Sequence, residues 1–329
     1  MSRIFAALFI SCTALLVNPV AKAEATPGQK AVLVTGASSG LGRKMTEAMA
    51  AQGYFVYAGA RKDKDMAELN AIENVQAVRL DVNKQDEIDA AVKTISEAGR
   101  GLYGLVNNAG VVLLRPLIEI DEKDFHFQME VNIFGVYRIT RAFAPLIIES
   151  KGRIGIMGSI AGTLSSATWG PYAMTKHAME AYADALADEM RQFGVKVSLI
   201  EPGTYKSKIA QNALDRMEAR NQSAEDSQFQ AAMDESVNWL TAFERDSGDP
   251  AEVAEAVMQA LFDENPKPRY LVVPNQQQAY WTINRAIERM VEQNQDQKYS
   301  YDRDALVEML DAALAKQPGA NQQQERSPN

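Results

Sequence analysis

Cysteine and histidine are the scarcest reactive residues in this chain of 329 residues. The single cysteine, Cys12, excludes disulfides within the chain and cysteine-rich zinc sites. The two histidines, His126 and His177, exclude multi-histidine metal sites and metalloproteases of the HExxH type. A Ser-His-Asp hydrolase would have to use one of these two histidines. The chemistry must therefore come mainly from serine, tyrosine, lysine, asparagine or carboxylate side chains, or from a cofactor.

The chain also lacks an excess of positive charge. It has 34 lysines and arginines against 43 acidic residues, which gives a formal net charge of −9. No basic face is implied, so nucleic acid is not an expected partner. With 46% hydrophobic and 23% charged residues, the composition is typical of a globular protein with room for one large α/β domain or two smaller ones.

A short apolar segment near the N-terminus differs from the rest of the chain. An unbroken apolar run, Ile4–Val17, follows Arg3. Asn18-Pro19 would break a helix there, and Ala21-Lys22-Ala23 is a small-x-small cleavage pattern. The pattern predicts a secretory signal peptide at residues 1–23 and an exported or membrane-associated protein. Two alternatives stay open: a membrane anchor, with membrane contact only through residues 4–17, and a mis-assigned start ahead of a cytoplasmic enzyme.

From residue 30 onward, short apolar runs alternate with longer helical patterns. The runs predict buried parallel strands at Ala31–Val34, Tyr54–Ala58, Val75–Leu80, Leu102–Val106, Arg153–Met157, Val195–Ile200 and Tyr270–Val273. The patterns between them predict helices at Leu41–Ala51, Lys84–Ala98, Phe127–Ser150, Tyr172–Phe193 and Ala251–Phe262. This alternation predicts a Rossmann-like, doubly wound α/β sheet.

The expected catalytic domain spans residues 28–274. Within it, the polar segment Lys206–Asp246 has no strand pattern and predicts a helical lid over the carboxyl edge of the sheet. Residues 275–315 contain two helical patterns, Gln276–Glu292 and Asp302–Ala315, and form a C-terminal extension. Tyr280 and Trp281 are expected to anchor this extension to the domain. Residues 316–329 are expected to form a disordered tail.

A glycine-rich turn follows the first expected strand. Gly36, Gly40 and Gly42 are spaced as GxxxGxG, unlike GxGxxG or the P-loop. Glycines at a strand–helix junction let the backbone approach a pyrophosphate, which the N–H groups and dipole of the helix N-terminus then hold. The turn therefore predicts nucleotide binding, although a tight connection alone would also explain it.

Two basic residues end the second expected strand. An NAD site usually has an acid near this point to bind the ribose 2′-hydroxyl, whereas this chain has Arg61 and Lys62. Positive charge there suits a 2′-phosphate, so we expect NADP(H) to be preferred over NAD(H). The alternative is a pair of solvated charges on a loop.

The catalytic candidates are Tyr172, Lys176, Ser159 and Asn132. Tyr172 and Lys176 are one helical turn apart on one face, and Ser159 ends an earlier strand. A carbonyl that receives hydride needs a proton donor, and a neighbouring ammonium would lower the pKa of a phenol toward neutral pH. Lys176 would supply that charge, Ser159 would orient the carbonyl oxygen, and Asn132 would support a proton relay through water.

Several motifs occur in order along residues 30–205. They are Thr35-Gly36-xxx-Gly40-x-Gly42, Asn107-Asn108-Ala109-Gly110, Asn132, Ser159 and Tyr172-xxx-Lys176. Together they resemble the short-chain dehydrogenase/reductase family. The resemblance implies a catalytic tetrad of Asn132, Ser159, Tyr172 and Lys176, with Tyr172 as the acid/base. It also implies an oxidoreductase that acts on CH–OH groups with NAD(P) as acceptor.

The resemblance further implies cofactor contacts along the carboxyl edge of the sheet. Asp81 would contact the adenine and Asn108 would stabilise the sheet and line the cofactor. Pro202-Gly203-xxx-Ser207 resembles the family's PGxxxT loop over the nicotinamide, with Ser in place of Thr. The full expected set is Gly36, Ser38, Ser39, Gly40, Leu41, Gly42, Arg61, Asp81, Asn108, Tyr172, Lys176, Pro202, Gly203 and Ser207.

The C-terminal part of the domain resembles the hydroxysteroid and retinol dehydrogenase branch. The motifs are Asp249-Pro250-xx-Val253-Ala254 and Pro266–Pro274. An apolar carbonyl or alcohol, such as a steroid, a retinoid or an acyl-chain carbonyl, is the expected substrate. Relatives associate through two long helices, so a homodimer or homotetramer is expected.

One departure and two rival functions remain. Ser39 stands where many NADP-dependent members carry Arg or Lys, so Arg61 bears the cofactor preference alone. The first rival is a dinucleotide-binding scaffold or sensor without turnover, against which the intact tetrad argues. The second is a hydrolase using Ser159 with His177, which lacks a GxSxG elbow.

Overall fold

The computed structural model describes residues 28–220 and 222–316. The predicted leader and most of the predicted tail lie outside the described residues. Seven strands are present: β1 (Ala31–Val34), β2 (Phe55–Ala60), β3 (Val75–Arg79), β4 (Gly104–Asn107), β5 (Arg153–Met157), β6 (Lys196–Pro202) and β7 (Arg269–Val272). The helices between β1 and β6 are α1 (Gly40–Ala51), α2 (Asp63–Asn70), α3 (Gln85–Glu97), α4 (Glu122–Met129), α5 (Gly135–Glu149) and α6 (Gly170–Arg191). After β6 come α7 (Ile209–Ala219), α8 (Gln230–Asp246), α9 (Ala251–Phe262), α10 (Gln276–Asn294) and α11 (Arg303–Ala315).

The strands form one parallel sheet in the order β3-β2-β1-β4-β5-β6-β7. The chain builds outward from β1 to β3, crosses back and builds outward again from β4, so the direction reverses between β1 and β4. In open α/β sheets, ligands bind outside the carboxyl ends of the strands at such a switch point. The predicted doubly wound fold is confirmed.

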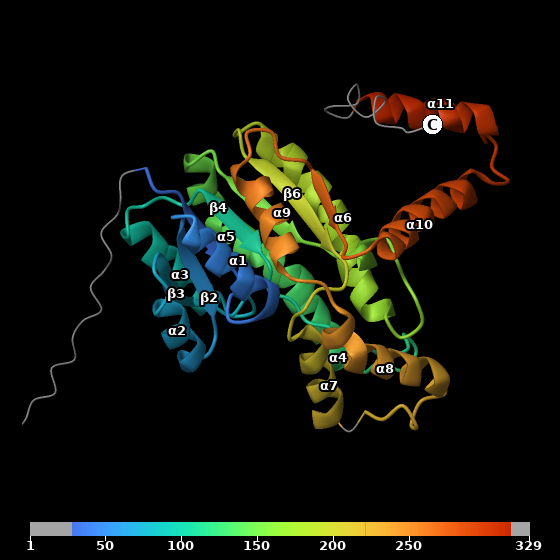
Figure 1. Cartoon of the computed structure of the whole chain (residues 1–329), viewed down its shortest axis with the longest axis horizontal. Coiled ribbons are helices and arrows are strands. Elements are labelled where there is room, and N and C mark those ends of the chain that lie inside the picture. Colours follow the sequence, from blue (N-terminus) through green and yellow to red (C-terminus); the bar gives the residue numbers. More distant parts are fainter. Residues whose placement is uncertain (1–27, 221, 317–329) are drawn as a thin grey trace, which may run out of the picture.

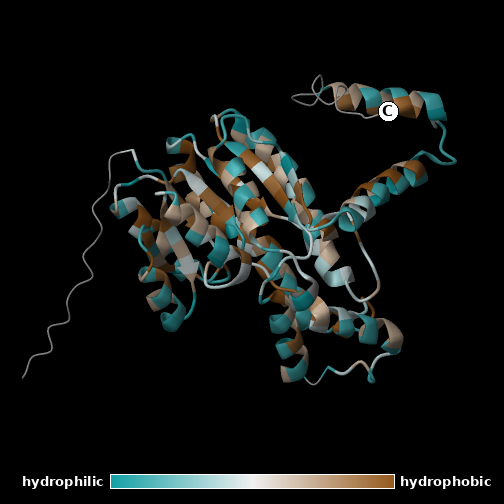
Figure 2. Ribbon diagram, viewed as in Figure 1, coloured by the Kyte–Doolittle hydropathy of each residue, from teal (hydrophilic) through white to brown (hydrophobic). Residues whose placement is uncertain are grey.

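Alternating side chains on each strand enter two different cores. Leu33 and Tyr57 pack with α3, α5 and α6, whereas their neighbours Val32 and Val56 pack with α1, α2 and α9. Successive residues of a strand point to opposite faces, so each central strand needs apolar residues throughout. Both helical layers and the apolar strands between them are visible in Figures 1 and 2.

Three of the predicted elements match the structure residue for residue: Ala31–Val34, Arg153–Met157 and Ala251–Phe262. Helix α2 was not predicted, because its polar sequence buries only Leu69. The helix predicted at Phe127–Ser150 begins earlier, at Glu122, and contains a π-helical segment, η1 (Glu130–Phe134). The stretch Glu122–Glu149 is long and apolar enough to cross a membrane, but Ile139, Phe143 and Ile147 pack in the core.

The lid and the extension lie on opposite sides of the sheet's carboxyl edge. Helices α7 and α8 form the lid that the sequence predicts, and α10 leads away from the body toward α11 (Figure 1). Helix α10 has only two buried residues, Gln278 and Thr282, and α11 has none. The extension therefore touches the domain mainly through the first turns of α10.

Candidate active site

A cavity of about 950 Å³ runs along the carboxyl edge of the sheet. It is lined by the glycine-rich turn, the ends of β2 to β6, the first turns of α6, the lid helices and one face of α10. Every predicted site residue except Asn132 lines it. These residues are far apart in sequence and meet here because parallel strands all end at the same edge.

Tyr172 and Lys176 are the buried ionisable pair of this cavity. Burial raises the pKa of Tyr172 to about 12, and a hydrogen bond with the Ser159 side chain acts in the opposite direction. Burial lowers the pKa of Lys176 to about 8. The Lys176 ammonium lies 5.6 Å from the centre of the Tyr172 ring and donates a hydrogen bond of 2.7 Å to the Met157 carbonyl.

The pKa of Tyr172 is raised, whereas the sequence predicts that Lys176 lowers it. In this structure burial dominates both groups. Removing the groups from water disfavours the phenolate and the ammonium alike. The hydrogen bond with Ser159 is the influence that favours the phenolate.

Asn132 lies in the π-helical segment η1, behind the cavity wall. Its Oδ1 accepts from the Val111 N–H at 2.8 Å, and its Nδ2 donates to the Val111 carbonyl at 2.9 Å. Nδ2 also lies 3.1 Å from the Thr175 hydroxyl, which donates to the Tyr172 carbonyl at 2.7 Å. The side chain of Asn132 thus ties the loop after β4 to the turn of α6 that carries Tyr172.

The glycine-rich turn is closely packed. A Cβ on Gly42 would lie 2.3 Å from the Gly36 carbonyl oxygen and 2.5 Å from Nδ2 of Asn108. Asn108 Nδ2 in turn donates to the Thr35 carbonyl at 2.8 Å, which joins the ends of β1 and β4. The Ser39 side chain makes no capping bond and the first turn of α1 contains no acid. The helix N-terminus therefore presents N–H groups to the cavity.

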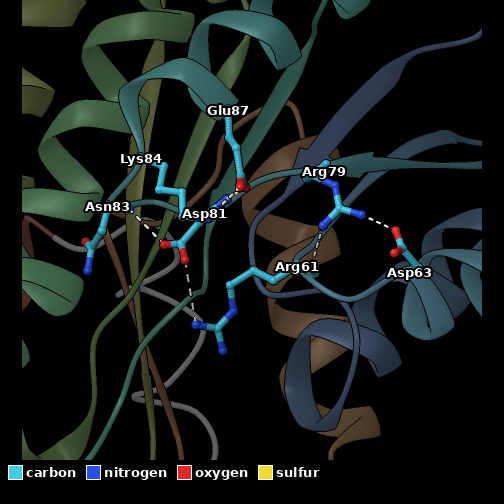
Figure 3. A network of polar contacts seen from close by, with 7 residues as sticks. All are labelled: Arg61, Asp63, Arg79, Asp81, Asn83, Lys84 and Glu87. Atoms are coloured by element: carbon cyan, nitrogen blue, oxygen red, sulfur yellow. Dashed lines mark hydrogen bonds and ion pairs between the residues drawn. The ribbon is translucent and has the colours of Figure 1, made fainter.

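Arg61 and Asp81 face each other across the ends of β2 and β3 (Figure 3). The Arg61 guanidinium is 3.9 Å from the Asp81 carboxylate, and 63% of the Arg61 side chain is exposed. Asp81 is oriented by the Asn83 N–H, which donates to its carboxylate at 3.0 Å. Arg79 donates to the Arg61 carbonyl at 2.6 Å and pairs with Asp63, so the backbone at Arg61 is held in place.

Residues 30–218 match the family model described as short chain dehydrogenase. The chain belongs to the short-chain dehydrogenase family. Oxidoreductase YbbO of Escherichia coli (strain K12), described as uncharacterized, is 34% identical over 246 residues, which are 74% of this chain and 86% of that one. Retinol dehydrogenase 7 of Rattus norvegicus is 32% identical over 260 residues, 73% of this chain and 80% of that protein.

A solved structure agrees with the fold. The short-chain dehydrogenase/reductase of Burkholderia phymatum in complex with NAD is 26% identical, with a TM-score of 0.70 over 83% of this chain and 98% of that one. The predicted family, its hydroxysteroid and retinol branch and the enzyme class, an oxidoreductase acting on alcohols, are confirmed.

In this short-chain dehydrogenase, aromatic rings wall the cavity next to Tyr172. The Trp169 ring lies 6.2 Å from the Tyr172 ring and 4.9 Å from the ring of Trp239 on α8. Phe243 follows at 5.0 Å from Trp239, and Leu240 completes this side. The wall combines the start of α6 with the lid, so the lid helps to define the space beside the phenol.

The C-terminal extension contributes to the cavity, which the sequence analysis did not predict. One face of α10 places Gln278, Trp281 and Arg285 along the cavity. Gln278 is buried, and its Oε1 accepts from the Thr204 N–H at 3.0 Å. Tyr280 and Trp281, which the sequence predicts as anchors, are 62% and 48% exposed, whereas Gln278 and Thr282 are the buried residues of α10. Gln278 stands in a run of three glutamines, whose polarity gave no signal for burial.

The ring nitrogens of His177 face groups other than Ser159. Its Nδ1 lies 2.9 Å from the Ala173 carbonyl and its Nε2 lies 3.2 Å from the Arg289 guanidinium on α10. Both ring nitrogens are thus engaged with other groups. A hydrolase that uses Ser159 with His177 therefore has no base in position.

Proposed function

We propose that this chain is an NADP(H)-dependent oxidoreductase that interconverts an alcohol with a ketone or aldehyde on an apolar substrate. The observation that supports it most is the position of Tyr172, hydrogen-bonded to Ser159 in a cavity that also holds Lys176 and the glycine-rich turn. Tyr172 acts as the general acid/base. Asn132 acts through its contacts with Val111 and Thr175, which position α6.

The residues along the cavity fit a nicotinamide dinucleotide. Gly42 and Gly36 approach too closely for any side chain at position 42, and the adjoining N–H groups of α1 suit a pyrophosphate. Asp81 and Asn108 would contact the adenosine side, and the segment from Pro202 to Ser207 would cover the nicotinamide. The Burkholderia phymatum relative, solved with NAD, supports a dinucleotide, and Arg61 supports NADP(H) over NAD(H).

Proton transfer is the part of the reaction that this chain's own residues perform. In the reduction, the neutral Tyr172 hydroxyl donates its proton to the substrate oxygen, which Ser159 holds, and becomes a phenolate. In the oxidation, the phenolate form of Tyr172 accepts the proton of the substrate hydroxyl. The bound cofactor supplies the hydride acceptor, and in the reduction the hydride donor. Lys176, held by the Met157 carbonyl, keeps an ammonium beside the phenol and would also bind the nicotinamide ribose.

The apolar substrate is inferred from the wall of the cavity. Trp169, Trp239 and Phe243 form a continuous aromatic surface beside Tyr172. Such a surface removes apolar area from water and has few polar groups to satisfy. A steroid, a retinoid or an acyl-chain carbonyl fits this chemistry, and the relatives named retinol dehydrogenase 7 and 17-beta-hydroxysteroid dehydrogenase type 6 support it.

The test compares the full chain with Tyr172→Phe. Nicotinamide fluorescence should show tighter binding of NADPH than of NADH by the wild type. A panel of apolar secondary alcohols, ketones and retinoids should then reveal turnover. Tyr172→Phe should lower kcat by about 10²–10⁴-fold because the proton donor is lost, with the Kd for NADPH changed less than about twofold.

Two results would contradict the proposal. If neither dinucleotide binds, the chain is not an NAD(P)-dependent enzyme. If NADPH binds tightly but no substrate of the panel turns over, the chain is the dinucleotide-binding scaffold that stands as the alternative.

Two further proposals concern the oligomeric state and the location of the protein. We propose a homodimer or homotetramer through α5 and α6, where Tyr137, Met174 and the adjoining Phe134 of η1 are exposed. Light scattering tests it, and a monomer at micromolar concentration would contradict it. We also propose an exported or membrane-associated protein, with contact through residues 4–17, or else a cytoplasmic one; fractionation of cells distinguishes them.

A further inference from the structure

Two arginines from distant segments lie on the wall of the same cavity. Arg61 follows β2, and Arg216 is in the lid helix α7. Along α7, Ile209, Asn212 and Arg216 all line the cavity, which is the spacing of one helical face. Burial lowers the pKa of Arg216, and the nearby charges of Arg61 and Arg220 lower it further, whereas the Asp215 carboxylate acts in the opposite direction.

Arg216 is not neutralised within the described part of the chain. Its NH1 donates to the Asn212 carbonyl at 3.0 Å, and no carboxylate forms an ion pair with it there. The adjacent Asp215 instead accepts from Gln211 at 2.7 Å. Arg220, one turn further on, differs because Asp124 pairs with it at 2.9 Å. A half-buried guanidinium that faces another cation is destabilised unless an anion lies between them.

The start of α7 is fixed against the cofactor turn. A Cβ on Gly40 would lie 2.8 Å from the Cβ of Ser207, and Ser207 and Lys208 lead directly into the helix. The adjacent face of α7 buries Ala210, Ala213 and Met217, and Ala210 also lines the cavity. The row that carries Arg216 therefore runs from the glycine-rich turn toward the end of β2, where Arg61 lies.

We propose that Arg61 and Arg216 together bind the 2′-phosphate of NADP(H), so that the phosphate holds the lid helix over the cofactor. This inference rests on the proposed function. A phosphate monoester carries nearly two negative charges at neutral pH, which two guanidinium groups can share through paired hydrogen bonds. NAD(H), which lacks this phosphate, leaves the Arg216 charge beside Arg61, which then has, among the described residues, only the Asp81 carboxylate at 3.9 Å. The lid would thus respond to the identity of the dinucleotide.

The experiment uses the full chain and a matched pair of variants, Arg216→Gln and Arg220→Gln. Both remove one positive charge from the end of α7, but Arg220 is paired with Asp124. Fluorescence titrations with NADPH and NADH should show that Arg216→Gln weakens NADPH binding about tenfold or more. Its Kd for NADH should change less than about twofold, and Arg220→Gln should leave the ratio of the two Kd values unchanged. Arg216→Lys, which keeps the charge, should recover part of the loss.

Hydrogen exchange reports the lid directly. Amides of residues 209–219 should exchange more slowly with NADPH than with NADH, and Arg216→Gln should remove this difference. Circular dichroism shows whether the variants are folded. If Arg216→Gln does not fold, Arg216→Met, which also removes the charge, replaces it in both measurements.

The possible failures are distinguishable. If Arg216→Gln affects the binding of both dinucleotides equally, or affects neither, Arg216 does not bind the 2′-phosphate, but the proposed oxidoreductase activity still stands. A wild type that binds NADH more tightly than NADPH would overturn both the shared binding of the 2′-phosphate by Arg61 and Arg216 and the proposed preference for NADP(H). A wild type that binds neither would overturn the proposed function itself.

Discussion

At the residue scale, burial changes the pKa values of the two neighbouring groups that carry the proposed proton transfer. Tyr172 is kept neutral by a pKa raised to about 12, and Lys176 has a pKa lowered to about 8. The native state therefore releases the Lys176 proton before the unfolded state does. Between pH 8 and pH 10.5 the unfolded chain binds more protons at this lysine, so the free energy of unfolding rises with pH there.

Lys176→Met should remove this dependence. Between pH 7 and pH 10, the free energy of unfolding of the wild type should rise by about 2–3 kcal/mol because of Lys176. Tyr172 acts mainly at higher pH: its pKa is raised in the native state, so its contribution to stability is lost as the pH rises toward 12. Urea unfolding of both proteins at pH 7, 8.5 and 10 measures the rise, and other titrating groups cancel in the difference. Identical pH profiles for the two proteins would show that Lys176 does not have a lowered pKa.

At the element scale, the π-helical segment η1 decides where Asn132 points. Its i→i+5 hydrogen bonds widen the helix at Asn132, whose amide bonds both backbone groups of Val111 in the loop after β4. The same amide reaches Thr175 on α6. The segment therefore joins three elements at the back wall of the active site.

Asn132→Ala should destabilise the protein by about 2–4 kcal/mol, because it leaves the buried N–H and carbonyl of Val111 without partners. It should also lower kcat more than it raises KM, since Tyr172 loses its support through Thr175. Denaturant unfolding and steady-state kinetics measure these two effects. Asn294→Ala is the control: this asparagine also bonds backbone groups, but its hydrogen bonds are exposed, so the change should alter stability by less than about 0.5 kcal/mol. If Asn132→Ala changes stability by less than about 0.5 kcal/mol as well, Asn132 does not hold the Val111 backbone in place.

At the scale of the whole molecule, the C-terminal extension divides into a part that supports the site and a part that does not contact it. Gln278 braces the backbone at Thr204, and a Cβ on Gly203 would lie 2.2 Å from its Oε1. Arg289 reaches the Thr163 carbonyl at 3.0 Å as well as His177. Helix α11 buries no residue, and Figure 1 shows it away from the body.

Two truncations separate these parts. Removing residues 296–329 should leave the melting temperature within about 2 °C and the Kd for NADPH within about twofold, because none of residues 296–316, the described part of this segment, is buried. Removing residues 275–329 should lower the melting temperature by several degrees and weaken NADPH binding, because the loop that includes Gly203 loses Gln278. Thermal melting and fluorescence titration check both. If the two truncated chains have the same melting temperature and the same Kd for NADPH, α10 does not support the site.

Much of the fold and most of the candidate site could be predicted from the sequence. Buried parallel strands need apolar residues on both faces, so runs such as Ala31–Val34 are recognisable without tertiary information. The order of the strand ends then places the glycine-rich turn, Ser159 and Tyr172 at one edge. Helix α2 was missed because a short, polar, exposed helix has almost no apolar period.

The sequence by itself determined the doubly wound sheet, the glycine-rich turn and the residues expected at the active site, because these depend on local periodicity and on motifs of fixed spacing. Only the tertiary structure decided that Arg216 and Arg61 line the same cavity. It also decided that Gln278 bonds the Thr204 backbone and that Asn132 bonds the Val111 backbone. Each of these contacts joins segments far apart in the chain through polar side chains. Their placement depends on how whole helices pack, and no local pattern records it.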